Sequence, residues 1–128
     1  MRPRDARDAG DQALRLYSTI EKEVFEEGYD ALITPTVATT RIRAKFDPTA
    51  EMPVINGKSV DPYAGWFLTS VFSLLNWMPV VTVPTGIARN NVPTGMQIVC
   101  RPYQDATAAA ISMLYSQAAP AMRFPDLS

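Results

Sequence analysis

The residues with the clearest capacity for chemistry are a lysine and a serine that stand side by side, Lys58 and Ser59. A lysine that loses its proton can act as the base for a serine nucleophile in amide and ester cleavage. Neighbours in sequence rarely direct their side chains at each other, however, and a lysine in a loop normally stays solvated and protonated. Burial or a nearby cation would have to lower the pKa of the amine, and the sequence predicts neither. We therefore expect no Ser-Lys dyad at this position.

The same pair, together with Gly57, matches the end of a phosphate-binding loop. The complete motif needs a second glycine five residues before Gly57, and Met52 occupies that position. It also needs a helix directly after the serine, whereas Asp61-Pro62 follows here. The match predicts a surface turn and no nucleotide site.

Other reactive groups are few. The absence of histidine from the sequence excludes Ser-His-Asp and Cys-His catalysis, and His-ligated zinc or haem, within this chain. The single cysteine, Cys100, ends an apolar stretch, so we expect a buried, inert thiol and no internal disulfide. Asp47, Glu51 and Asp61 lack the spacing of metal ligands and should be solvated. The residues alone predict no catalytic constellation, no metal site and no cofactor.

Composition limits the classes of partner. The chain has 128 residues, 47% of them hydrophobic and 20% charged, with a net charge of −1. These values suit one globular domain and argue against a nucleic-acid binder that neutralises phosphates. No apolar stretch follows the mixed charges of Met1–Asp5, so we expect no signal peptide, and a single free thiol fits a cytoplasmic protein.

The first half of the chain reads as one helix, one strand and a long loop. Apolar residues recur at three- and four-residue steps between 5 and 27, which predicts an amphipathic helix with Gly28 as its stop. Residues 29–34 form a short strand candidate. Residues 35–61 have little periodicity and contain three prolines, so we expect a long loop that is functional or packs on something else.

The second half reads as a helix, a hairpin and a final helix. We expect a helix over 62–75, strands over 79–84 and 95–100, and a helix from an N-capping Asp105 to about residue 119. The whole order predicts a mixed α/β class, with a short mixed sheet that contains a β-hairpin and is flanked by helices. We treat 1–128 as one domain, made of a helical part (1–28), a strand with its loop (29–61) and the remainder (62–128).

Residues 62–88 carry no charge, which raises the question of a membrane span. A helix stopped before Pro79 is shorter than the roughly 20 residues that a span needs, so a buried helix and strand are the better interpretation. Four aromatic residues within this segment fit core packing, with the lining of an apolar pocket as the functional alternative. They are Trp66, Phe67, Phe72 and Trp77.

Two longer motifs carry a family resemblance. Residues 79–86 (PVVTVPTG), 92–99 (VPTGMQIV) and 101–103 (RPY), followed by Asp105, form the first motif. Residues 29–36 (YDALITPT) form the second, in the right order and at similar spacing. The chain from about residue 15 to its end thereby resembles the C-terminal region of the amidase signature family, which includes enzymes like the glutamyl-tRNA amidotransferase A chain.

The resemblance implies a partial amidase-signature fold from a longer enzyme that hydrolyses amide C–N bonds. Family members use a serine nucleophile, a second serine in a cis peptide and a lysine base, all upstream of the region matched here. None of the three falls on a residue of this chain, so the resemblance implies a fragment that is inactive alone. The missing N-terminal region would be its natural partner.

The resemblance also indicates where substrate would lie. The helix end before Pro79 borders the substrate pocket in relatives, which assigns a pocket wall to Val71, Leu74, Leu75 and Trp77. Leu74 and Trp77 replace a frequent asparagine and glycine of the family, and Asn76 is two residues out of register with that asparagine. These replacements leave the substrate preference open, and core packing explains the same residues almost as well.

An alternative of a different class remains open. The chain could be a stand-alone, non-catalytic interaction protein, for instance a partner of a full-length amidase. An apolar surface over residues 62–83 that the upstream region no longer covers would then favour self-association. We expect no nucleic-acid partner and no membrane span in either case.

Overall fold

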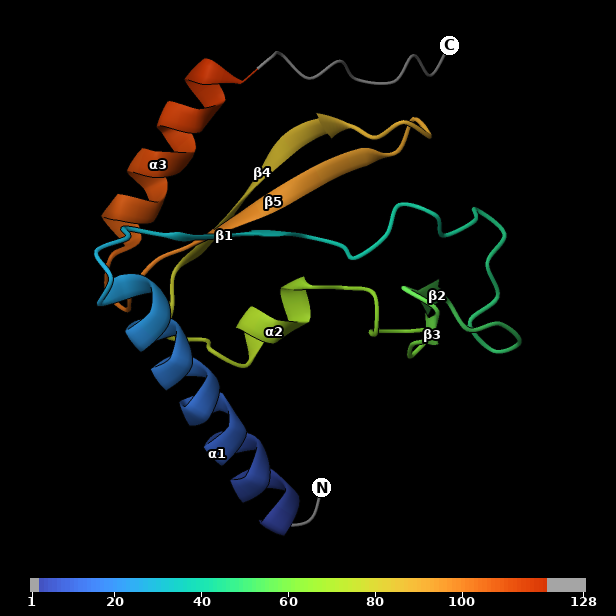
Figure 1. Cartoon of the computed structure of the whole chain (residues 1–128), viewed down its shortest axis with the longest axis horizontal. Helices are drawn as coiled ribbons and strands as arrows, with labels where there is room; N and C mark the ends of the chain where they lie inside the picture. Colours follow the sequence, from blue (N-terminus) through green and yellow to red (C-terminus); the bar gives the residue numbers. More distant parts are fainter. Residues whose placement is uncertain (1–2, 120–128) are drawn as a thin grey trace.

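The structure is a computed structural model that describes residues 3–119, with side chains from residue 8 onward (Figure 1). It begins with helix α1 (Pro3–Ile20), which continues without a break into a π-helical turn, η1 (Glu21–Phe25). The sequence predicted this element as one helix over 5–27. Gly28 follows with φ +94°, a backbone conformation that glycine adopts without steric cost, and this conformation ends the helix as expected.

A three-stranded sheet forms the centre of the fold. Its strands are β1 (Leu32–Pro35), β4 (Val80–Ile87) and β5 (Pro93–Val99), in the spatial order β1-β5-β4. Leu32 and Val80 both pair with Val99, so residues far apart in the sequence share one register. The expected hairpin is present, with Asn91 in the left-handed region at φ +61°.

Both pairings in this sheet are antiparallel. The α/β class and the hairpin between helices are confirmed, but the expectation of mixed pairing is wrong for the described residues. β5 lies between β4 and β1 and runs opposite to both, so no parallel neighbours arise within this part of the chain.

The helix predicted over 62–75 is largely absent, because α2 covers only Thr69–Ser73. The preceding residues follow two other sets of hydrogen bonds. Asp61 accepts the backbone N–H groups of Tyr63 and Ala64 through Oδ1, at 2.9 and 2.7 Å. Val37 and Phe67 then form an antiparallel bridge. Pairing with a distant segment therefore replaces the local helix.

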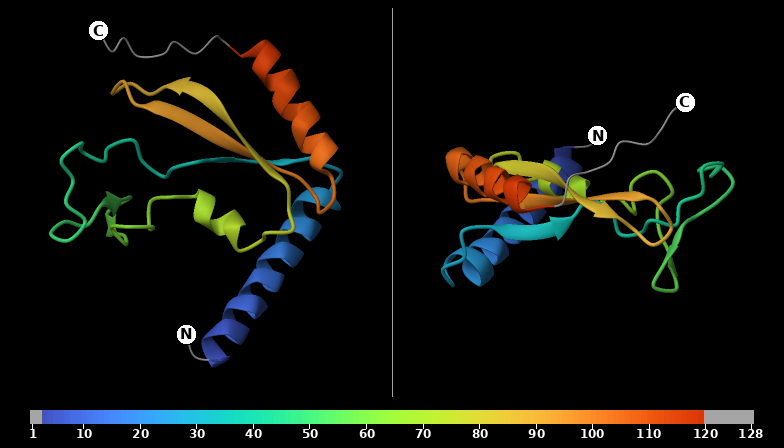
Figure 2. Two further views of the ribbon diagram at one scale, coloured as in Figure 1. Left: turned by 180° about the vertical axis from the view of Figure 1, so that it is seen from behind. Right: turned by 90° about the horizontal axis from the view of Figure 1, so that it is seen from above.

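The long loop predicted over 35–61 contains a small hairpin. Its strands are β2 (Val54–Ile55) and β3 (Lys58–Ser59), joined by Asn56-Gly57 with φ of +50° and +77°. Two positive φ values are what a tight hairpin turn requires, and Asn-Gly supplies them at low cost. The segment between β1 and α2 extends away from α1 and α3 (Figures 1 and 2).

Two apolar clusters cover the two faces of the sheet. On one face, Phe25, Phe72, Leu75 and Met78 pack with Val99. On the other face, helix α3 (Asp105–Ala118) places Ala108 against Val83, Ile98 and Cys100. Asp105 is the first residue of α3, not its N-cap; Gln104 is the N-cap, and it makes no side-chain capping bond.

In the described part of the chain, no helix combines the length and apolar character that crossing a membrane requires. The uncharged segment that raised this question is divided instead between the short helix α2 and the strand β4.

Candidate functional site

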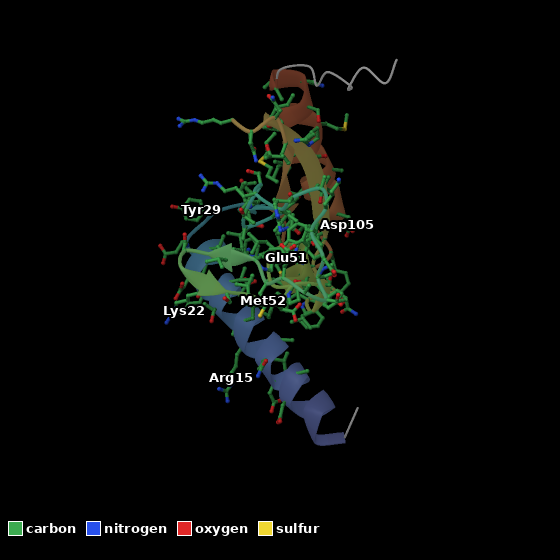
Figure 3. The ribbon with its side chains drawn as sticks, turned by 90° about the vertical axis from the view of Figure 1, so that its right-hand side faces the viewer. Arg15, Lys22, Tyr29, Glu51, Met52 and Asp105 are labelled. Carbon is green, nitrogen blue, oxygen red and sulfur yellow. The ribbon has the colours of Figure 1, made fainter. Side chains whose placement is uncertain are left out.

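The structure does not assemble Lys58 and Ser59 into a catalytic pair. Both lie exposed on β3, where successive side chains point to opposite faces of the strand. The other two lysines, Lys22 and Lys45, are exposed as well. Lys22 and Arg15 project outward from the first helical segment (Figure 3). None of the three lysines is buried.

The serine hydroxyls near the predicted pocket wall are engaged with their own helix. Ser70 donates to the carbonyl oxygen of Phe67 at 3.0 Å, and Ser73 donates to that of Thr69 at 3.3 Å. Ser18, Ser112 and Ser116 make the same kind of bond to the preceding turn. A serine arranged in this way has its hydroxyl proton engaged with the backbone of its own helix.

The other sequence candidates are structural. Cys100 is fully buried, and burial, with a smaller contribution from the charge of Asp30, raises the pKa of its thiol. Hydrogen bonds from Thr49 lower the pKa of Asp47, which belongs to a local turn. Glu51 pairs with Arg43, on the segment that projects toward the viewer in Figure 3. Among the described residues, no cluster of His, Cys, Asp or Glu could hold a metal ion.

The four residues assigned to a pocket wall take different positions. Leu75 is 0% exposed and lies inside the core, whereas Leu74 is 56% and Trp77 39% exposed. Leu74 and Trp77 line an apolar hollow of about 380 Å³ against α1, and Trp77 lines a second of about 420 Å³ with Tyr17 and Tyr103. Val71 is exposed on α2 and lines neither hollow. We call the surface of Leu14, Leu74 and Trp77 the tryptophan groove; its role as a pocket wall stays a prediction.

The four aromatic residues of this segment do not form one cluster. Trp66 stacks on Phe67 at a centroid distance of 3.9 Å, Phe72 is buried in the core, and Trp77 meets Tyr17 edge-on at 6.1 Å. Core packing is therefore confirmed for Phe72. The contribution of α1 to the tryptophan groove was missed, because the helical periodicity of 5–27 indicates only which face is buried.

A polar network borders the groove. The guanidinium of Arg101 lies 3.0 Å from Glu21 and over the ring of Phe25 at 5.3 Å. Tyr17 donates its hydroxyl proton to Glu21 at 3.2 Å, and partial burial together with the carboxylate raises the pKa of Tyr17. This network ties η1 to the segment after β5. Tyr103, two residues beyond Arg101, is almost fully exposed at φ +64°.

A third hollow, of about 490 Å³, lies at the far end of β1. It is formed by the end of β1, the segment 37–41 and the β4–β5 hairpin, and we call it the threonine hollow. The residues that line it include Thr39, Thr40, Thr85 and Thr94. Arg41 also lines it, and the same side chain lines a smaller neighbouring hollow. No sequence motif indicated this site, because hairpin pairing brings together threonines that are far apart in the chain.

Comparison with known proteins places these surfaces in context. No family model matches the chain. The glutamyl-tRNA(Gln) amidotransferase A chain of Beijerinckia indica is 28% identical over 108 residues, which cover 82% of this chain and 20% of that protein. The corresponding protein of Granulibacter bethesdensis is 30% identical, covering 77% of this chain and 19% of that protein.

A solved structure agrees with these relatives. The crystal structure of a bacterial aryl acylamidase belonging to the amidase signature enzymes family matches with a TM-score of 0.68 and 26% identity, over 85% of this chain and 21% of that one. The resemblance to the amidase signature family is confirmed. The chain spans about a fifth of the length of these relatives.

Proposed function

We propose that the chain is the C-terminal part of an amide-hydrolysing amidase signature enzyme and is inactive alone. The observation that carries this proposal is the match to about a fifth of an amidase fold. The exposed lysines of the described residues, and the helix serines that donate to backbone carbonyls, support it. Hydrolysis of an amide needs an activated nucleophile and donors for the oxyanion. The upstream part of the enzyme would supply both.

In the complete enzyme, the tryptophan groove would form part of the substrate-pocket wall. Leu74 and Trp77 are large, apolar and exposed, and a substrate pocket is lined mainly by apolar and aromatic side chains. Leu75 would act from behind, by holding the wall against the sheet. The cytoplasm would be the location of such an enzyme, as the single free thiol suggests.

A hybrid enzyme tests this proposal. The aligned region of the bacterial aryl acylamidase is replaced by this chain, and hydrolysis of an aryl acylamide is measured. We expect activity above that of the truncated acylamidase, and Trp77→Ala should change selectivity among acyl groups. As a matched control, Tyr29→Ala alters an exposed aromatic residue outside the groove and should leave selectivity unchanged. A folded hybrid without activity would contradict the proposal.

The tryptophan groove also supports the second candidate function, a stand-alone interaction protein. Exposed apolar surface that is contiguous usually binds a partner, and here it extends from Leu14 through Leu74 to Trp77. A second copy of the chain could cover it. Sedimentation of the purified chain and of a Trp77→Asp variant tests for self-association, because this substitution would dissociate a dimer formed through the groove.

A further inference from the structure

The threonine hollow is held open by hydrogen bonds between the segments that form it. The backbone N–H and the hydroxyl of Thr36 both donate to the carbonyl oxygen of Gly95, at 3.0 and 3.1 Å. Asn90, at the tip of the hairpin, donates its side-chain amide to the carbonyl oxygen of Thr40 at 2.6 Å. Both ends of the 36–40 segment are thus fixed to the hairpin, and a site fixed in advance loses little conformational entropy when a ligand binds.

Gly95 contributes to this arrangement by lacking a side chain. A Cβ atom built at that position would lie 3.2 Å from the carbonyl oxygen of Val83 and 3.3 Å from Cγ2 of Thr36. Its φ is not positive, so the glycine serves the close approach of Thr36 and not an unusual backbone angle.

One side of the hollow is apolar. Ile33, which is 50% exposed, pairs with Ile98 on the sheet face that α3 covers only over β4 and β5. Met96 and Val37 continue this surface. An aliphatic or aromatic group resting here would remove apolar area from water.

The other side is rich in donors and carries positive charge. Arg41 lines the hollow, and among the side chains described, those of residues 8–119, its guanidinium has no ion pair, whereas the nearby Arg43 is paired with Glu51. The hydroxyl of Thr39 accepts the backbone N–H of Arg41 at 3.2 Å, which leaves the hydroxyl proton free to donate. No aspartate or glutamate is among the residues that line the hollow.

We propose that the threonine hollow binds a small organic acid, with its carboxylate at Arg41 and Thr39 and its apolar body on Ile33 and Met96. A guanidinium and a hydroxyl donor suit a carboxylate, which accepts charge-assisted hydrogen bonds from both. A neutral amide of the same shape would place its own donors against these donors and would lose the charge interaction. This inference goes beyond the proposed function, since it concerns binding by the chain itself.

The test is an NMR titration of the isotopically labelled chain at constant ionic strength. The probes are benzoate, benzamide of the same shape, and inorganic phosphate as a simple anion. We expect saturable shifts from benzoate at the methyl groups of Ile33, Val37 and Met96, and weak, unsaturated shifts from benzamide and phosphate.

Two arginine variants distinguish specific binding of benzoate in the hollow from general attraction of an anion to the positive charges of the chain. Arg41→Gln should weaken benzoate binding by about tenfold, as expected for losing a charge-assisted hydrogen bond. Arg89→Gln removes the same charge from an exposed residue on the hairpin that does not line the hollow, and should leave the affinity unchanged. Arg41 is itself exposed, so folding of its variant is expected and is read from the same spectra.

Four results would overturn the proposal. One is the absence of saturable benzoate shifts in the hollow, and another is equal binding of benzamide. Equal loss of affinity in both arginine variants would indicate attraction to net charge alone. Phosphate that bound as tightly as benzoate would mean that the apolar side contributes nothing and that the site takes simple anions.

Discussion

At the scale of single residues, Gln97 shows how a polar group is accommodated in the sheet. Its side chain is 2% exposed, and its amide nitrogen donates to Thr34 Oγ1 at 3.1 Å and to the carbonyl oxygen of Pro35 at 3.2 Å. Burial of an amide is favourable only when such partners exist. Gln97 therefore joins β5 to β1 through its side chain as well as its backbone.

Replacing Gln97 by methionine keeps the length of the side chain and removes both hydrogen bonds. We expect the free energy of unfolding to fall by about 1–3 kcal/mol, the usual cost of leaving buried groups without partners. Urea denaturation measures the change. Thr82→Val is the matched control. Thr82 lies on β4 and pairs with Gln97 of β5, but its side chain is exposed, so its substitution should matter little. Equal losses in both variants would contradict a special role for the amide.

Cys100 leads to a prediction about pH. Burial raises the pKa of its thiol above the ordinary value of 9.0. The folded state therefore retains the proton longer than the unfolded state, so this stabilising contribution is complete below that pH and is lost as the pH rises through the folded-state pKa. We expect the wild-type chain to lose more unfolding free energy between neutral and alkaline pH than Cys100→Ala, by denaturant titration at each pH. Parallel curves would show that the thiol has no part in the alkaline loss.

At the scale of elements, two neighbouring leucines directly after the short helix α2 lie in different environments, one in the core and one on the surface. Leu75 is completely buried against the sheet, while Leu74 next to it is more than half exposed in the tryptophan groove. A helix only five residues long has little stability of its own and depends on this packing.

Leu74 and Leu75 allow the same substitution, leucine to alanine, to be compared at an exposed and at a buried position. Leu75→Ala should cost about 2–5 kcal/mol of unfolding free energy, because it leaves a cavity in the core. Leu74→Ala should cost much less in the isolated chain, since its side chain is largely in water. Thermal and urea unfolding of both variants measure the difference, and similar costs would mean that Leu74 is buried in solution, for instance by a second copy.

The success of sequence-based prediction also varied by element. The terminal helices and the β4–β5 hairpin were predictable, because apolar periodicity, proline, glycine and asparagine act locally there. The helix over 62–75 failed because Val37 pairs with Phe67, a contact that no local pattern encodes. The threonine hollow was not predictable for the same reason, since Thr39 and Thr94 meet only when β1 and the hairpin pair.

At the scale of the whole molecule, the chain has the features of one part of a larger fold. The exposed tryptophan groove and the match to about a fifth of the amidase relatives both agree with an upstream region that packs beside this groove. This apolar surface would be costly to leave in water in an isolated domain.

The purified chain should accordingly show no amide or ester hydrolysis. Its lysines are exposed and the serines of its helices donate to backbone carbonyls, which agrees with the proposal that the catalytic groups lie in the upstream part of the enzyme. Turnover of aryl acylamides and simple esters is measured beside Ser59→Ala. A rate that followed the protein through purification and disappeared in this variant would show that Ser59 is a nucleophile after all.

The most direct test of the central claim is the mass of the native protein in its source cell, by immunoblotting with an antibody to this chain and by peptide mapping. We predict a product several times larger than 14.1 kDa, with peptides that precede Met1. A product of 14.1 kDa, with no preceding peptides, would contradict this claim and would make the stand-alone interaction protein the better interpretation.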